Sequence, residues 1–133
     1  MAQPPASDRW RPLHANPACF EHAAVIGVSP QRMADFENAL LELLDACSAE
    51  IHVWAVLPNH YHALVSVDDI TPILTGSTKL HGRTAFAWNR EDDRRGRQVW
   101  CGMAETQMKS DRHFWASLNY VLNNPVRPRA RRC

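Results

Sequence analysis

The sequence predicts an α+β fold: an antiparallel sheet with helices packed mainly on one face. Its 133 residues suit a single domain with one core. Hydrophobic residues make up 45% of the chain and charged residues 22%, as in ordinary globular proteins. The order of strand, helix, strand, strand, helix, strand and helix is typical of a split β-α-β, ferredoxin-like arrangement. We expect these elements at residues 18–26, 31–48, 51–57, 60–67, 71–89, 98–104 and 110–123.

The first strand is expected at residues 18–26, where Pro17 at its front suits an edge strand. Residues 1–12 are polar and rich in proline, so we expect them to be loose. Because no long linker and no internal repeat divides the chain, residues 1–133 are interpreted as one domain.

The first helix has a clear start and a clear apolar stripe. Ser29 is placed as its N-cap, and Pro30 follows at the first helical position. The residues that repeat at helical spacing are Met33, Phe36, Leu40, Leu43, Leu44 and Cys47. This pattern predicts a helix over residues 31–48.

A hairpin follows. Residues 51–57 are rich in β-branched and aromatic side chains, as strands are. Pro58 and Asn59 form a plausible tight turn, and residues 60–67 return as the second strand. Because strand side chains alternate, one face of the second strand should meet the core and the other should not. The expected core face is Tyr61, Ala63, Val65 and Val67, and the other face is His60, His62, Leu64 and Ser66.

The second helix is predicted over residues 71–89, with Thr71 as its cap and Pro72 at its first position. Gly76 and Gly82 weaken the prediction that this helix is continuous.

The rest of the chain is expected to form a loop, a strand and a last helix. The mixed acidic and basic stretch 90–97 is interpreted as a loop. Ser110 and Asp111 suit the start of the last helix, and Pro125 disfavours its continuation.

Charge and cysteine content limit the class of protein. The formal net charge is +1, which argues neither for nor against a nucleic-acid partner. The four cysteines form no C-x-x-C pair, and no signal peptide is recognisable. We therefore expect reduced thiols and a cytoplasmic protein. No apolar run approaches the ~18 residues of a membrane span, so no membrane partner is expected.

Two histidines carry the first chemical signal. His60 and His62 lie two residues apart on a predicted strand, so both side chains point the same way. Neutral imidazoles bind divalent metals well, and two of them leave coordination positions for a substrate oxygen. The alternative interpretation is a solvated polar strand face.

The last helix carries the second signal. Tyr120 and Asn124 lie one turn apart, opposite its apolar side. From there Tyr120 could reach the histidines, and Asn124 could donate its amide oxygen to the same metal. The alternative is a surface tyrosine and a helix-end asparagine. Taken together, the two signals predict a metal-assisted tyrosine nucleophile that acts on a phosphodiester.

These segments resemble a known family. Residues 58–62, Pro-Asn-His-Tyr-His before an apolar strand, resemble the HUH signature of single-tyrosine transposases. Residues 120–127, Tyr-Val-Leu-Asn-Asn-Pro-Val-Arg, resemble the tyrosine helix of that family. Residues 81–84, 96–100 and 110–116 resemble one bacterial branch, the REP-associated tyrosine transposases.

The resemblance implies a ferredoxin-like fold with the histidines on a central strand. It implies nicking and strand transfer of single-stranded DNA beside a hairpin, with Mg²⁺ or Mn²⁺ and a 5′-phosphotyrosine intermediate. His60, His62 and Asn124 match the metal ligands, and Tyr120 matches the nucleophile. The expected protein is a bacterial, nucleoid-associated monomer or homodimer.

Other functions stay open at this stage. The short basic tail at residues 127–133 also suits a domesticated or truncated relative that binds structured DNA without cleaving it. A phosphodiesterase that uses water, and a structural module without a metal, are further alternatives.

Recognition of a structured single strand needs phosphate contacts and base stacking. Tryptophans and arginines can also serve the fold alone, and that alternative applies to each candidate. The candidate DNA-binding residues are Arg83, Arg94, Arg95, Arg97, Trp100 and Arg127, with Trp88 as a second stacking candidate.

Overall fold

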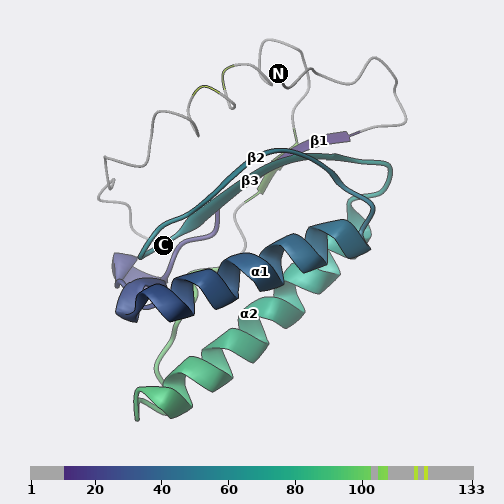
Figure 1. The fold of residues 1–133 in the computed structure, drawn as a ribbon. Coiled ribbons are helices and arrows are strands. Elements are labelled where there is room, and N and C mark those ends of the chain that lie inside the picture. The colour runs from purple at the N-terminus through teal and green to yellow at the C-terminus, as the bar shows by residue number, and fades with distance from the viewer. Residues whose placement is uncertain (1–10, 103–104, 108–115, 117–118, 120–133) are drawn as a thin grey trace.

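The computed structural model describes residues 11–102, 105–107, 116 and 119 (Figure 1). Its sheet has the strand order β2-β3-β1-β4, and every pairing is antiparallel. The helices α1 and α2 lie on the same side of this sheet (Figure 1). The predicted α+β, ferredoxin-like arrangement is therefore confirmed. The elements are β1 (Arg11–Ala15), the 3₁₀ turns η1 (Phe20–His22) and η2 (Ile26–Val28), α1 (Pro30–Ala46), β2 (Glu50–Val56), β3 (Tyr61–Val67), α2 (Thr71–Glu91) and β4 (Glu105–Gln107).

The first helix, the hairpin and the second helix agree with the sequence predictions to within a few residues. At the start of α1, the Ser29 hydroxyl accepts a hydrogen bond from the Arg32 N–H at 3.0 Å, as predicted for a cap. The predicted cap of α2 is wrong. Ile70 is the N-cap there, and the Asp69 carboxylate accepts from the Thr71 N–H at 3.0 Å.

The predicted first strand at residues 18–26 is wrong. The strand is β1, so Arg11 and Pro12 belong to the sheet and not to a loose terminus. Residues 18–28 instead contain two 3₁₀ turns and two isolated bridges, Ala18 to His60 and Cys19 to Trp100. The physical reason is tertiary, because β1 is held by its pairing with β3 and has little strand signal of its own.

The predictions for the C-terminal part have mixed outcomes. The strand expected at 98–104 is reduced to the bridge at Trp100, and β4 follows later in the chain. Between them Gly102 has a φ of 139°, a conformation that interrupts an extended run. Of the predicted last helix, only Ala116 and Asn119 are described, and both are helical.

The core lies between the helices and one sheet face. The predicted inward face of β3 is confirmed, because all four of its residues belong to the buried cluster. Gly76 does not interrupt α2. A Cβ there would lie 2.3 Å from Leu43 Cδ1, so the missing side chain lets α1 and α2 approach closely. The main partners of the β3 face are Leu13, Phe36, Leu40, Leu44, Ile73, Leu80, Trp88 and Trp100.

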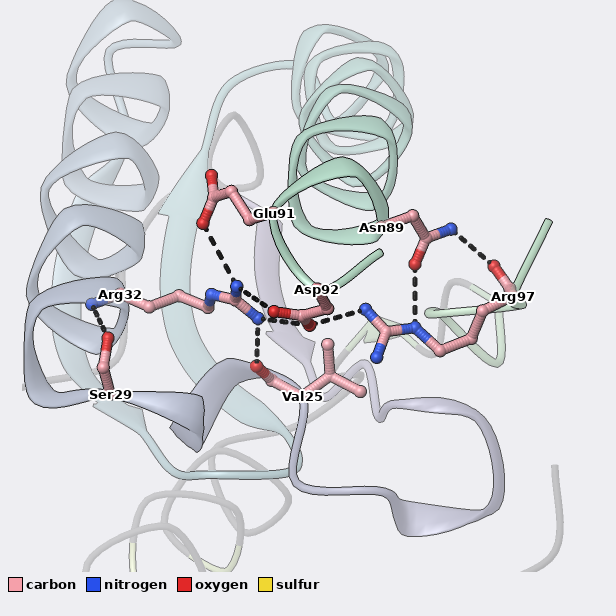
Figure 2. A network of polar contacts seen from close by, with 7 residues as sticks. All are labelled: Val25, Ser29, Arg32, Asn89, Glu91, Asp92 and Arg97. Carbon is pink, nitrogen blue, oxygen red and sulfur yellow. Dashed lines mark hydrogen bonds and ion pairs between the residues drawn. The ribbon is translucent and has the colours of Figure 1, made fainter. Parts of the chain in front are cut away.

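One buried arginine ties the two helices together (Figure 2). The Arg32 guanidinium, 6% exposed, donates to both carboxylate oxygens of Asp92, at 2.8 and 3.0 Å. It also donates to the Val25 carbonyl at 3.0 Å and pairs with Glu91 at 3.1 Å. Arg97 pairs with the same Asp92 at 2.9 Å. Hydrogen bonds from Arg32 are the main reason that the pKa of Asp92 falls to about 2.

A buried histidine joins β3 to α2. His81 Nε2 is hydrogen-bonded to the Tyr61 hydroxyl at 2.8 Å, and its ring stacks on Trp100 with centroids 4.2 Å apart. Burial lowers the pKa of His81 to about 4, so the folded protein keeps this ring neutral at neutral pH.

Replacing Arg32 should destabilise the fold strongly. In Arg32→Met the Asp92 carboxylate keeps only Arg97 as a charged partner, and the Val25 carbonyl loses its donor. Breaking a buried pair in this way costs about 3 kcal/mol or more in the free energy of unfolding, measured in urea. The control is Glu91→Gln, which changes an exposed partner and should cost about 1 kcal/mol or less. Equal losses in both variants would contradict this assignment.

Acid should weaken the fold through His81. Its folded pKa is below its unfolded value of 6.5, so the unfolded chain takes up a proton first as the pH falls. The stabilisation by the neutral ring is complete above pH 6.5 and is lost as the pH falls towards 4. Between pH 7 and pH 5 this linkage should lower the free energy of unfolding by about 2 kcal/mol. In His81→Gln, which cannot titrate, urea unfolding should show a smaller loss, and an unchanged loss would refute the assignment.

Candidate metal-binding site

The turn before β3 is fixed by close packing. The Leu57 N–H donates to the His60 carbonyl at 2.9 Å and closes the predicted turn. From η2, the Gly27 N–H donates to the Pro58 carbonyl at 3.0 Å. A Cβ on Gly27 would lie 2.4 Å from Pro58 Cβ, so only glycine permits this approach. The backbone that carries His60 is therefore held from outside the hairpin.

His60 and His62 lie together, as predicted. Their ring centroids are 4.9 Å apart, and the rings meet edge to face at 85°. His60 is half-buried, whereas His62 is 1% exposed. The His60 Nδ1–H donates to the Asn59 side-chain oxygen at 2.6 Å, while the Asn59 amide donates to the His22 carbonyl at 3.4 Å. This pair of bonds places the lone pair of His60 on Nε2, the nitrogen that could bind a metal.

A third histidine was missed by the sequence analysis. His14 on β1 lies opposite Leu64 in the register of β1 with β3, and so on the same sheet face as His62. Its Nε2 lies 3.1 Å from His62 Nδ1, and the two rings stack with centroids 5.3 Å apart. Correct placement of β1 would have found it, because Leu13 and Ala15 face the core and His14 lies between them.

The two candidate ligands are held in the neutral form. Burial lowers the pKa of His62 to about 3, with further lowering by the neighbouring His60 and His14. Burial also lowers the pKa of His60, and His22 adds to this effect. Neutral imidazole is the form that binds a metal, so no proton has to leave these rings at neutral pH.

The other predicted partners of this site lie outside the described residues. These are the nucleophile Tyr120, the third ligand Asn124 and the basic residue Arg127. Within the part of the chain that the structure describes, no three histidine, cysteine or carboxylate side chains are grouped to hold a metal. The described residues therefore supply two of the predicted ligands.

The candidate DNA-binding residues fall into two groups. Arg83, Arg94 and Arg95 are exposed. By contrast, Arg97 pairs with Asp92, and its Nε–H donates to the Asn89 side chain at 2.8 Å. Arg97 thus has a structural role, the alternative that the sequence left open for each of these candidates.

Trp100 also departs from its expected role. It is 8% exposed, one face of its ring stacks on His81, and its Nε1–H donates to the Thr84 hydroxyl at 3.1 Å. Phe36 and Trp88 contact the same ring. A nucleic-acid base has no access to a ring packed in this way, so Trp100 is a core residue. Trp88, also buried, belongs to the same cluster.

Two further observations concern cysteines and membranes. The expectation that all four thiols are reduced is wrong for Cys101, which is disulfide-bonded, whereas Cys19 and Cys47 are free thiols. Sequence spacing could not reveal this bond, because it depends on distance in the fold. No described helix combines the length and the apolar character needed to cross a membrane.

The fold is similar to that of two solved transposase structures. No family model matches the sequence, and no curated protein matches it. A REP-associated tyrosine transposase bound to a REP hairpin has a TM-score of 0.64 at 14% identity, over 95% of this chain and 73% of that one. A candidate transposase from Deinococcus radiodurans R1 has a TM-score of 0.58 at 15% identity, over 94% and 98% of the respective chains. The resemblance to REP-associated tyrosine transposases is therefore confirmed at the level of the fold.

Proposed function

We propose that this protein nicks and rejoins single-stranded DNA beside a hairpin, with Mg²⁺ or Mn²⁺ and a 5′-phosphotyrosine intermediate. The observation that supports this most is the pair of neutral histidines, His60 and His62. Their rings are in contact, edge to face, at the start of the central strand β3. The fold around them is similar to that of a transposase bound to hairpin DNA.

The residues present suit a divalent ion. Asn59 fixes the His60 ring so that its Nε2 lone pair is available, an arrangement typical of metal-binding histidines. We assign His60, His62 and Asn124 as the ligands. When bound, the ion would offset negative charge on the scissile phosphate. A site with two imidazoles and one amide oxygen keeps positions for the phosphate oxygens.

Tyr120 is proposed as the nucleophile. Its hydroxyl, with an ordinary pKa near 10, must lose its proton as it attacks phosphorus. A bond forms between the tyrosine oxygen and phosphorus, and the bond from phosphorus to the 3′ oxygen breaks. The products are a 5′-phosphotyrosine and a free 3′-hydroxyl. Since the phosphodiester character is kept, another 3′-hydroxyl can reverse the reaction and join a different strand.

His14 is proposed as a positioning residue for His62. If the His62 Nδ1–H donates to His14 Nε2, the lone pair of His62 lies on Nε2, as it does in His60. The stacked rings also limit rotation of the buried His62 side chain. His14 would act through His62, without touching the substrate.

Covalent capture tests the nucleophile. With Mn²⁺ and a labelled hairpin oligonucleotide carrying a single-stranded flank, the protein should form an adduct that survives denaturing electrophoresis. Tyr120→Phe should abolish it, because the attacking oxygen is removed.

The chain has only one other tyrosine, Tyr61, which provides the matched control. Its hydroxyl is buried against His81, so Tyr61→Phe should keep the adduct if it folds, as circular dichroism can verify. Cleavage without any adduct, still present in Tyr120→Phe, would indicate a phosphodiesterase that uses water. DNA binding with neither adduct nor cleavage would leave only a DNA-binding role.

Calorimetric titration with Mn²⁺ tests the histidines. His62→Ala should remove binding, and His14→Phe should weaken it about 10- to 100-fold, the usual effect of losing a partner that orients a ligand. His14→Gln keeps an acceptor oxygen and should restore part of the affinity. His52→Gln, which alters a histidine bonded to Ser66 at 2.8 Å, should bind Mn²⁺ normally. Unchanged Mn²⁺ affinity in His14→Phe would contradict the positioning role.

A further inference from the structure

Acidic and basic side chains are segregated between the two helices, although the net charge of the chain is only +1. On α1 the single cation is the buried Arg32, and four acidic residues lie outside the core. On α2 no acidic residue occurs before Glu91 at its end. The acidic residues of α1 are Asp35, Glu37, Glu42 and Asp45.

Four exposed residues form a stripe along α2, which we name the α2 stripe: Lys79, Arg83, Phe86 and Arg90. Their spacings of four, three and four residues place them on one helix face. The opposite face of α2 packs into the core. Phe86 is 72% exposed, more than Val28 at 56% and Trp54 at 41%, the other exposed large hydrophobic residues of the described part of the chain. Arg94 and Arg95 are exposed just beyond the helix end.

A bare patch of backbone lies within the stripe. Gly82 sits three residues after Lys79 and four before Phe86, so it neighbours both. A Cβ at Gly82 would meet no atom within 4 Å. Glycine is a poor helix former, and packing among the described residues does not require it here. The patch leaves room for a flat group beside the Phe86 ring.

Cations around an exposed ring suit one kind of partner. Single-stranded nucleic acid is bound by cations that follow the phosphates and by aromatic rings on which bases stack. From Lys79 to Arg90 the stripe is about 16 Å long at the rise of an α-helix, enough to face several phosphates. A protein partner that binds by apolar contact would need a wider apolar surface than this one ring.

The stripe is separate from the histidine site. His81 on the inner face of α2 contacts Tyr61 on the core side of β3, whereas His62, with the His60 ring against it, lies on the other sheet face. Figure 1 shows α2 beside α1, on the same side of the sheet. The face of α2 that carries the stripe, opposite its buried residues, therefore points away from the sheet. We propose that the α2 stripe is a second binding surface for single-stranded nucleic acid, outside the histidine site. This inference does not require that the protein cleaves DNA.

The test is fluorescence anisotropy of a labelled oligothymidylate about 20 nucleotides long, longer than the usual site sizes, at several salt concentrations. The full chain is used with a chelator, which excludes any metal-dependent step. Combining Lys79→Gln, Arg83→Gln and Arg90→Gln should weaken binding and reduce the slope of log K against log salt by about 2. Phe86→Ala should weaken binding about 5-fold or more, because one stacking contact is lost.

Matched controls separate the stripe from general effects. Combining Ala34→Glu, Asn38→Glu and Ala46→Glu lowers the net charge by the same three units, at exposed positions on α1, and should leave the salt slope unchanged. Val28→Ala shortens another exposed apolar side chain and should leave the affinity unchanged. Circular dichroism verifies folding of each variant.

Three results would overturn the proposal. Wild-type affinity and slope in the triple stripe variant would show that DNA does not contact the stripe. An equal loss in the α1 variant would show that only total charge matters. A dimer that the stripe substitutions dissociate, at unchanged DNA affinity, would assign the stripe to the acidic α1 face of a second copy. Loss of the covalent adduct alone would bear on the proposed cleavage and not on this surface.

Discussion

The antiparallel pairing of β3 with both β1 and β2 determines the sheet face on which His14 and His62 lie. Since strand side chains alternate, this one register sends Tyr61 into the helix-covered core and His62 to the opposite face. A slip of one residue would exchange the two faces, burying imidazoles among apolar side chains. The core therefore specifies the histidine arrangement, because the apolar face of β3 fits only one register.

Two groups of contacts outside the sheet are connected to the turn before His60. One is the set of ion pairs around Arg32, and the other is the packing of Gly27 on Pro58. Arg32 joins the start of α1 to the end of α2 through Asp92 and holds the Val25 carbonyl. Shortly after Val25, the chain reaches Gly27, whose N–H holds the turn before His60. Through Val25 and Gly27, the Arg32 network is thus connected to the turn that carries His60.

Hydrophobic periodicity predicted the helices and strands that bury a long apolar stripe. It failed for β1, which forms because it pairs with another strand. The apolar repeat from Met33 onward was sufficient for α1, and the alternation after Tyr61 was sufficient for β3. β1 is short and contains Pro12, so its identity comes from β3, and His14 was missed with it. Residue type alone could not show that Arg97 would meet Asp92. The roles assigned to Tyr120 and Asn124 stay predictions, since both lie outside the described residues.

The central claim is that His60 and His62 coordinate the divalent ion at the phosphate that Tyr120 attacks. Anomalous diffraction from crystals of the Tyr120→Phe variant, grown with Mn²⁺ and a hairpin oligonucleotide, measures this most directly. Our account predicts one strong anomalous peak within coordination distance of Nε2 of both histidines, beside the scissile phosphate and facing the ring at position 120. A well-ordered complex whose Mn²⁺ lies elsewhere, or whose position 120 is remote from the phosphate, would contradict it.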